Sequence, residues 1–229
     1  MRHHKVFCYC HHEPTLVDEG SAFQTLSRNG AEHELAVKTL DELLHDAEAA
    51  HGHLCAGQVL GVRLAMLGLE LLGIDDPRGK DRKRLITFVE IDRCATDAVA
   101  VVTGCRLGKR ALKFRDWGKV AATFVDLASQ RAVRVCARES SKTLARQLHP
   151  EIENKNQQQM LAYRQLSNDD LFTVQWVKVS LPPEELPGYK GERIVCEQCG
   201  EGINFQREVH RDGHVLCHAC AGERYYEEI

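Results

Sequence analysis

Residues 56–72, Ala56-Gly-Gln-Val-Leu-Gly-Val-Arg-Leu-Ala-Met-Leu-Gly-Leu-Glu-Leu-Leu72, form the clearest helical pattern in the chain. Apolar residues recur at the spacing of one helix face: Val59, Val62, Met66 and Leu69. Gly73 follows directly and is a common C-terminal stop for a helix. The stretch therefore predicts a helix that ends at Leu72.

The segments on both sides of this helix predict an α+β core. A helix is expected from Glu34 to about Ala50, because apolar residues again follow the helical spacing. Further helices are expected at 96–102, 139–148 and 156–166. Short runs rich in β-branched and apolar residues predict strands at 85–91, 111–114, 121–127, 132–137 and 171–179. Their hairpin spacing favours an antiparallel sheet core with flanking helices.

Composition limits the classes of protein to consider. A chain of 229 residues has room for one ordinary domain and a small one. It has no apolar run long enough to span a membrane and no secretory signal, so we expect a cytoplasmic protein that does not bind membranes. A net charge of −3 makes nucleic acid an unlikely main partner. Ten cysteines without an export signal indicate metal binding or redox chemistry.

The chain divides into four expected segments. Residues 1–30 are an irregular N-terminal arm that includes Cys8, Cys10, His11 and His12. Residues 31–180 form the core. The three prolines in Leu181-Pro-Pro-Glu-Glu-Leu-Pro-Gly188 predict a linker at 181–190, which leaves 191–229 as a separate unit.

That last unit contains two Cys-x-x-Cys pairs with the spacing of a zinc finger. Cys196 and Cys199 form the first pair, and Cys217 and Cys220 form the second. Four thiolates in a closed tetrahedral arrangement are a preferred structural environment for Zn²⁺. We expect a final helix from Ala219 to Glu228.

The histidines and the net charge of the finger indicate which ligands and partners to expect for it. Its histidines, His210, His214 and His218, are expected to lie outside the ligand set. Residues 191–229 have four arginines against eight acidic residues, a balance of −4. This charge disfavours phosphate binding by the finger and favours a stabilising or protein-contacting role.

A second group of metal-ligand residues lies in His51-Gly-His53-Leu-Cys55, just before the helix that begins near Ala56. A helix N-terminus lowers the pKa of a nearby thiol, so Cys55 is a candidate ligand and the candidate catalytic nucleophile. The alternative is a small buried residue in a turn between helices. With Cys94, the residues His53 and Cys55 make a set of three ligands for a second metal ion in the core.

Two other cysteines and a basic segment are also notable. Cys105 lies at the end of a predicted element, and Cys136 is expected to pack in the core. Residues 106–119 have six basic residues against one acid, a balance of +5. They could attract a small anionic ligand, or they could form a solvated strand edge.

The strings His51-Gly-His53-Leu-Cys55-Ala-Gly57, Cys94-Ala-Thr-Asp97 and Thr103-Gly-Cys105-Arg-Leu-Gly-Lys109 resemble the formylmethanofuran dehydrogenase E-subunit family over residues 35–180. The resemblance implies an α+β core, an intertwined homodimer, and a cleft lined by the His-Gly-His-x-Cys turn and the downstream cysteine. It also implies a C-terminal treble-clef zinc finger. Ala56 departs from the family, where proline commonly follows the cysteine.

These patterns leave three functions open. The first is a metal-binding protein of redox or molybdenum/tungsten enzyme metabolism, whose core site serves a small anionic ligand or a partner oxidoreductase. The second is a regulatory or protein-interaction module that senses a metal, without catalysis. The third is a thiol enzyme in which His51 or His53 activates Cys55. The sequence does not decide whether the protein is an enzyme.

Overall fold

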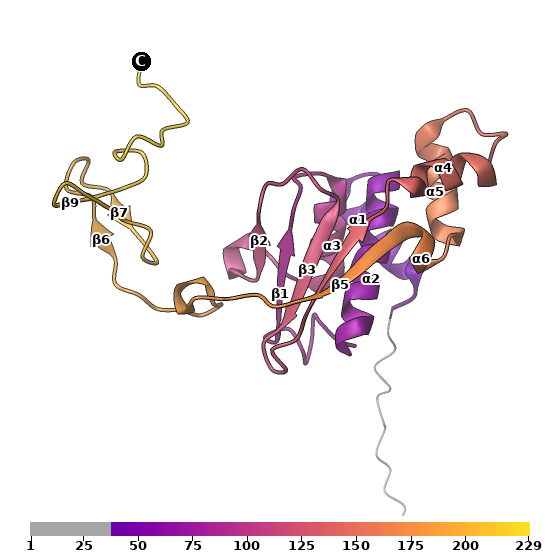
Figure 1. The fold of residues 1–229 in the computed structure, drawn as a ribbon, viewed down its shortest axis with the longest axis horizontal. Helices are drawn as coiled ribbons and strands as arrows, with labels where there is room; N and C mark the ends of the chain where they lie inside the picture. Colours follow the sequence, from indigo (N-terminus) through magenta and orange to yellow (C-terminus); the bar gives the residue numbers. More distant parts are fainter. Residues whose placement is uncertain (1–37) are drawn as a thin grey trace, which may run out of the picture. The chain divides into compact units, whose positions relative to one another are not determined.

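The computed structural model describes residues 38–229 (Figure 1). The predicted N-terminal arm, with Cys8, Cys10, His11 and His12, lies outside the described residues. The core contains six α-helices in chain order: α1 Leu40–His51, α2 Ala56–Leu72, α3 Cys94–Thr103, α4 Ser140–Leu148, α5 Lys155–Gln165 and α6 Asn168–Leu171. Five strands accompany them: β1 Leu85–Val89, β2 Leu112–Phe114, β3 Ala121–Asp126, β4 Ala132–Ala137 and β5 Phe172–Val177.

Helix α1 begins later than the sequence pattern predicted. Thr39 is its N-cap: the Glu42 N–H donates to Thr39 Oγ1, and the Glu42 carboxylate accepts from the Thr39 N–H at 2.7 Å. This reciprocal capping box satisfies two backbone donors that a helix N-terminus leaves without partners. Helix α1 therefore starts at Leu40, and residues 34–37 of the predicted helix lie outside the described residues.

The core sheet has the strand order β2-β1-β3-β4-β5. The pairs β1–β3, β3–β4 and β4–β5 are antiparallel, as predicted. Strand β2 instead runs parallel to β1, with Thr87 opposite Leu112. The reason is that α3 crosses over between them and returns the chain to the same end of the sheet.

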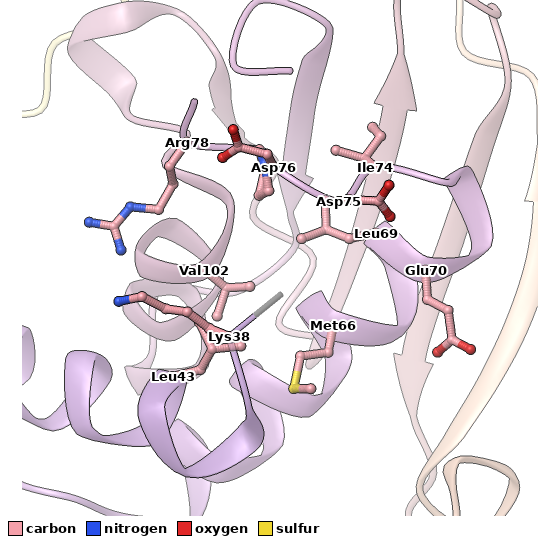
Figure 2. A pocket seen from close by; sticks show the side chains of 11 residues that line it. Lys38, Leu43, Met66, Leu69, Glu70, Ile74, Asp75, Asp76, Arg78 and Val102 are labelled. Carbon is pink, nitrogen blue, oxygen red and sulfur yellow. The ribbon is translucent and has the colours of Figure 1, made fainter. Parts of the chain in front are cut away.

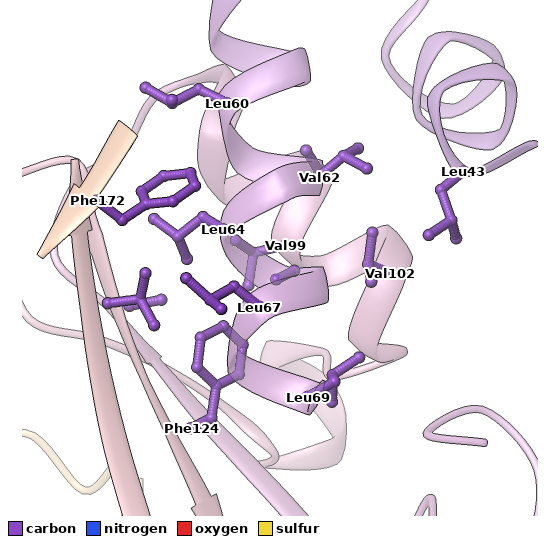
Figure 3. Close-up of a cluster of buried hydrophobic side chains, with 14 of the residues drawn as sticks. Leu43, Leu60, Val62, Leu64, Leu67, Leu69, Val99, Val102, Phe124 and Phe172 are labelled. Atoms are coloured by element: carbon purple, nitrogen blue, oxygen red, sulfur yellow. The ribbon is translucent and has the colours of Figure 1, made fainter. Parts of the chain in front are cut away.

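Helix α2 packs on one face of the sheet and forms the centre of the core (Figure 3). Phe124 of β3 and Phe172 of β5 point from the sheet toward this helix, and both are buried. Gly68 makes the close contact with Phe124 feasible, because a Cβ at position 68 would lie 2.2 Å from the Phe124 ring. The predicted α+β architecture is thus confirmed, with the backbone of α2 directly against the Phe124 ring at Gly68.

A second glycine of α2 determines the packing of α3. A Cβ at Gly61 would lie 2.5 Å from the backbone oxygen of Ala95 and 2.9 Å from the Ala98 Cβ. The two helices therefore touch along their backbones near their N-terminal ends. That close approach matters below, because Cys55 and Cys94 occupy those ends.

The segment 181–186 packs against the opposite face of the sheet. Leu181 and Leu186 contact a second buried cluster formed by Ile86, Val125 and Ala132. The short 3-10 helix η2, Pro183–Glu185, is fastened by its last residue: Arg115 donates to the Glu185 carboxylate at 2.8 Å, and Lys113 donates to the Glu185 backbone oxygen. Part of the predicted linker thus completes the core, and two basic residues of the 106–119 segment hold it there.

Residues 194–216 form two small hairpins of the C-terminal finger. Strand β6 Ile194–Val195 pairs with β7 Gly202–Ile203, and β8 Val209–Arg211 pairs with β9 His214–Leu216. The predicted final helix is wrong, because residues 219–229 form turns and bends. Gly222 has a φ of +98°, a left-handed conformation that stops the turn begun at the second cysteine pair.

None of the helices found between residues 38 and 229 combines the length and apolar character that crossing a bilayer requires.

Candidate metal centres

The four cysteines of the finger meet at one point. Their Sγ atoms all lie within 4.8 Å of one another, and those of Cys199 and Cys217 are 3.8 Å apart. Zinc–sulfur bonds of about 2.3 Å in a tetrahedron place neighbouring sulfurs about 3.8 Å apart, so the geometry fits Zn²⁺. The site joins the turn between β6 and β7, which contains Cys196 and Cys199, to the turn after β9, which contains Cys217 and Cys220.

Backbone donors distinguish the four thiols. The Cys217 N–H donates to Cys196 Sγ at 3.3 Å, and the Cys220 N–H donates to Cys217 Sγ at 3.4 Å. Hydrogen bonds from the backbone of Cys199 and Cys217 lower the pKa of Cys196 to about 6. Burial and the neighbouring Cys217 thiol raise the pKa of Cys220 to about 12. Cys196 is thus the thiol best prepared to be a thiolate.

The finger's histidines point to other partners. His214 Nδ1 lies 2.8 Å from Glu197, and His218 Nδ1 lies 2.8 Å from Glu223. His210 is exposed and lies 3.8 Å from a Glu208 carboxylate oxygen. Within residues 38–229, the ligand set of the finger therefore consists of the four cysteines, without histidine.

A second cluster forms where three helix ends meet. His51 is the last residue of α1, Cys55 is the N-cap of α2, and Cys94 is the first residue of α3. One ligand atom from each lies within 4.8 Å of the others. The sequence predicted His53 in this set. In the structure His53 is exposed and outside the cluster, with its ring centroid 4.8 Å from that of His51.

Neighbouring groups hold the two thiols in place. A Cβ at Gly57 would lie 3.2 Å from the Cys94 Cβ and 3.7 Å from Cys55 Sγ, so this glycine lets the cysteines approach. Gln58 is fully buried, and its Nε2 donates to the Cys94 backbone oxygen at 2.8 Å. Its Oε1 is buried without a hydrogen-bond partner among the described residues. An orphaned acceptor beside the cluster is consistent with a further group there.

Asp97 orients the histidine of this core site. Its Oδ2 lies 3.0 Å from His51 Nδ1, which leaves Nε2 as the nitrogen that can bind a metal. Histidine ligands commonly donate their other ring N–H to a carboxylate in this way. Burial, followed by a hydrogen bond with Cys55, raises the pKa of the Cys94 thiol. The core cluster therefore combines one oriented imidazole with two thiols, all within 4.8 Å of one another.

A cavity of about 480 Å³ opens beside the core site. His51, Cys94 and Asp97 lie in its wall, together with Arg93. Most of the remaining wall is apolar: Val89, Ile91, Leu107, Leu112 and Phe114. A small ligand in this cavity would reach the histidine and one of the cysteines.

The other cysteines of the core lie away from this cluster. Cys105, at the far end of α3, is buried, and its Sγ accepts from Thr87 Oγ1 at 3.5 Å. Burial raises the pKa of its thiol, as expected for a packing residue. Cys136 is half-buried on β4 and bonds to the Ala137 backbone oxygen. Neither joins a metal-ligand cluster among residues 38–229.

An apolar pocket of about 540 Å³ lies elsewhere on the helical layer (Figure 2). Leu43, Met66 and Val102 line it from α1, α2 and α3. Charged groups of both signs stand around these apolar side chains: Lys38, Glu70, Asp75, Asp76 and Arg78. Sequence reasoning missed this pocket, because no local pattern shows that three helices leave a space.

Comparison with known families accounts for both parts of the chain. A core of α-helices and one sheet, joined to a four-cysteine finger, defines a two-part metal-binding protein. The model of the family described as FmdE, molybdenum formylmethanofuran dehydrogenase operon, matches residues 50–173. This match covers more than half of the chain, which therefore belongs to the FmdE family. A prokaryotic dksA/traR C4-type zinc finger matches residues 189–226.

Two individual relatives support this assignment. A probable S-adenosyl-L-methionine-binding protein of Archaeoglobus fulgidus is 32% identical over 205 residues, which cover 81% of this chain and 54% of the relative. The chain thus spans about half the length of that curated relative. The crystal structure of a tungsten formylmethanofuran dehydrogenase FmdE-like protein from Syntrophus aciditrophicus matches 83% of this chain and 96% of its own, with a TM-score of 0.56 and 22% identity. The latter likeness shows the fold.

Proposed function

We propose that the core cluster of His51, Cys55 and Cys94 binds a second metal ion, in addition to zinc in the finger. The observation that supports this most directly is the meeting of one imidazole and two thiols within 4.8 Å at three helix ends. Two sulfurs and a nitrogen suit Zn²⁺ or another thiophilic ion. Three protein ligands leave a fourth position for water or a ligand, as in catalytic zinc sites.

The surrounding residues have distinct tasks in this proposal. His51 would bind through Nε2 while Asp97 holds its ring, and Gln58 would fix the backbone of Cys94. Both cysteines must lose their protons when a metal binds, so binding would release protons and weaken at low pH. The metal would supply Lewis acidity at its open position. Arg93 lies in the wall of the 480 Å³ cavity together with Asp92 and Asp97, so the metal ion would have to supply the remaining positive charge for a small anionic ligand there.

The proposed biological setting is redox or molybdenum/tungsten enzyme metabolism, with the chain serving a partner oxidoreductase. Membership of a family named for the formylmethanofuran dehydrogenase operon supports this setting. A regulatory module that senses metal through the same core site is the alternative. The finger's net acidic charge supports a protein partner over nucleic acid in either case.

Metal content per chain tests the core site. Protein purified without added metal is compared with Cys55→Ala and with Cys136→Ala, a control that removes a thiol outside both clusters. We expect two metal ions in the native protein and the control, and one in Cys55→Ala. A single zinc in all three proteins would contradict the proposal and leave either a metal-free thiol enzyme built on Cys55 or a finger-mediated binding module.

A second candidate function is binding of S-adenosyl-L-methionine in the apolar pocket of Figure 2. We propose it because a relative that matches 81% of this chain is named for that ligand. The pocket's volume of about 540 Å³ suits a nucleoside-sized molecule. Its apolar wall would take the adenine, while Glu70 and Asp75 would face the cationic end and Arg78 the carboxylate.

Calorimetric titration with S-adenosyl-L-methionine tests this candidate. We expect binding by the native chain and its loss in Met66→Trp, whose larger side chain would fill the pocket. Thermal unfolding of the variant shows whether it remains folded, and Glu70→Gln with Asp75→Asn gives a milder test that keeps the apolar wall. Absence of any binding heat with the native chain would rule out this function.

We also propose that the chain forms a homodimer, as the family resemblance implies. Strand β5 is an edge of the sheet, and its Val174 and Trp176 are 42% and 54% exposed. Exposed apolar residues on an edge strand are a liability that a partner would remove. Light scattering of the purified chain should give twice the 25.8 kDa chain mass. A monomer mass at every concentration would contradict it.

A further inference from the structure

A pocket of about 770 Å³ near the C-terminal end of α3 has side-chain charges of one sign only. Its lining comes from the turn after α2, the turn before β1, the connection from α3 to β2, and residues 186–188. The ionisable residues in this lining are all basic: Arg78, Arg82, Lys83, Arg106 and Lys109. Five cations around one concave surface concentrate the positive potential and attract anions.

These cations are mostly free of carboxylate partners. Within residues 38–229, only Arg78 of the five forms an ion pair, with Asp46 at 3.1 Å. The nearby carboxylates are occupied elsewhere: Asp81 and Asp126 bond to Arg84, and Glu185 bonds to Arg115. Asp76 accepts from the backbone N–H groups of Gly79 and Lys80. Apart from the Arg78–Asp46 pair, the acids among residues 38–229 therefore leave the cations of this pocket without carboxylate partners.

The backbone is also adapted to bring the cations together. Gly104 has a φ of +68° at the C-terminus of α3, and a Cβ there would lie 3.0 Å from the Arg78 Cγ. Because residue 104 is glycine, the Arg78 side chain can lie close to the backbone that leads to Arg106. Gathering like charges costs folding energy, so their convergence needs a cause other than stability.

The rest of the wall is apolar and favours a small ligand over a polymer. The lining is completed by Pro77, Gly104, Ala111, Leu127, Leu186, Pro187 and Gly188. A nucleoside or similar ring could pack on such a wall while phosphates face the cations. The chain's overall charge of −3 and the finger's acidic balance oppose a long polyanion running across the protein.

We propose that this basic pocket binds a small ligand with two or more phosphate groups, of the nucleoside diphosphate or triphosphate class. Arg106 and Lys109 hold the phosphates, Arg82 and Lys83 add to the potential, and the apolar wall receives the ring. The site uses none of the residues of the two metal clusters or of the cavity beside the core site.

Calorimetric titration of the full chain with ATP, pyrophosphate and adenosine tests the proposal at low salt. Three proteins are compared: the native chain, Arg106→Gln/Lys109→Gln, and the control Arg146→Gln/Lys155→Gln. The control removes two exposed cations from α4 and α5, so the net charge change is the same. Thermal unfolding and zinc content of each protein establish that it is folded and that the phosphates have not removed metal.

We expect the native chain to bind ATP and pyrophosphate and to bind adenosine more weakly. The Arg106/Lys109 variant should lose about tenfold or more in affinity for both phosphates, since charge-assisted hydrogen bonds are lost. The control should change by less than about twofold, because charges beyond the screening length contribute little. No binding by the native chain, or equal losses in both variants, would overturn the proposal. Tighter binding of single-stranded DNA than of ATP, weakened in the same variant, would also overturn it in favour of a polyanion surface.

Discussion

His51 Nδ1 and Asp97 Oδ2 lie 3.0 Å apart and join the end of α1 to the first turn of α3. The aspartate is 59% exposed in its side chain and the histidine 18%, so the pair stands where the core site meets solvent. Because Asp97 occupies Nδ1 of His51 and leaves Nε2 as the possible ligand atom, in the proposed core site it would act on the metal ion without touching it.

Asp97→Asn should therefore weaken metal binding at the core site by about 10- to 100-fold. The asparagine can still accept a hydrogen bond, but it lacks the negative charge that strengthens the bond from the imidazole N–H. Competition with a chromogenic chelator measures the affinity. Asp92→Asn is the matched control, because Asp92 lines the same cavity and forms no side-chain hydrogen bond to His51. Equal affinities in native protein and Asp97→Asn would remove Asp97 from the site.

Gly61→Ala should reduce the free energy of unfolding by about 1–3 kcal/mol, as overpacking of a close helix contact does. The new Cβ would meet the backbone of Ala95 at 2.5 Å, and backbone cannot move aside as a flexible side chain can. Gly108→Ala is the control, since a Cβ there meets nothing within 4 Å. Urea denaturation of both variants gives the comparison. Similar midpoints for the two would show that α2 and α3 accommodate the methyl group.

The buried carboxylate of Asp126 makes the folding stability of the core depend on pH in the acid range. Although burial opposes it, hydrogen bonds from Arg84, Ser129 and the Ala128 N–H hold the pKa of Asp126 at about 2. A depressed pKa stabilises the folded protein above the ordinary value of 3.8, and this contribution disappears as the pH falls toward 2. Its size at neutral pH is about 2 kcal/mol.

Asp126→Asn should accordingly be less stable than the native protein by about 2 kcal/mol at pH 7, with the difference shrinking between pH 4 and about 2. Thermal unfolding across this pH range measures the difference. Comparing the two proteins cancels the acid loss of finger zinc, which affects both. A difference that stays constant with pH would show that the carboxylate's charge is not the source of its contribution.

Cys199→Ser should remove one zinc per chain and unfold the finger, because structural zinc supplies the folding energy of such small units. The core buries its own apolar clusters and should keep its helical circular dichroism and its unfolding midpoint. Elemental analysis and circular dichroism check the two parts separately. Loss of core structure together with the zinc would mean that the finger and the core fold as one unit.

The sequence predicted the repeating features of this fold and missed those that arise from contacts between distant segments. Helix α2 and strand β4 have the predicted ends, because apolar spacing and turn residues mark them locally. The parallel pairing of β2 with β1 depends on how α3 crosses over, which periodicity does not encode. The packing of Leu186 under the sheet was likewise hidden, because prolines in the same segment indicated a linker.

The candidate sites show the same division. Cys-x-x-Cys spacing identified all four finger cysteines, since each pair is a local knuckle. To predict the core site correctly, one had to know whether His51 or His53 lies close to Cys55. Gly52, with a φ of +93°, reverses the chain after His51, and the structure leaves His53 exposed. Asp97, three residues after Cys94, was the available signal for His51, because an acid at that helix position can reach back to the preceding turn.

The glycine at position 57 has a consequence for divergence within the family. The thiols of Cys55 and Cys94 belong to separate helices, and the gap between them is limited by the single hydrogen atom of Gly57. A methyl group there would push the Cys94 side chain outward by a few tenths of an ångström. First-row transition metals differ in preferred ligand type and geometry. In the proposed core site, a substitution at position 57 would therefore change the spacing of the two thiols, and with it the preferred ion, while every ligand stays the same.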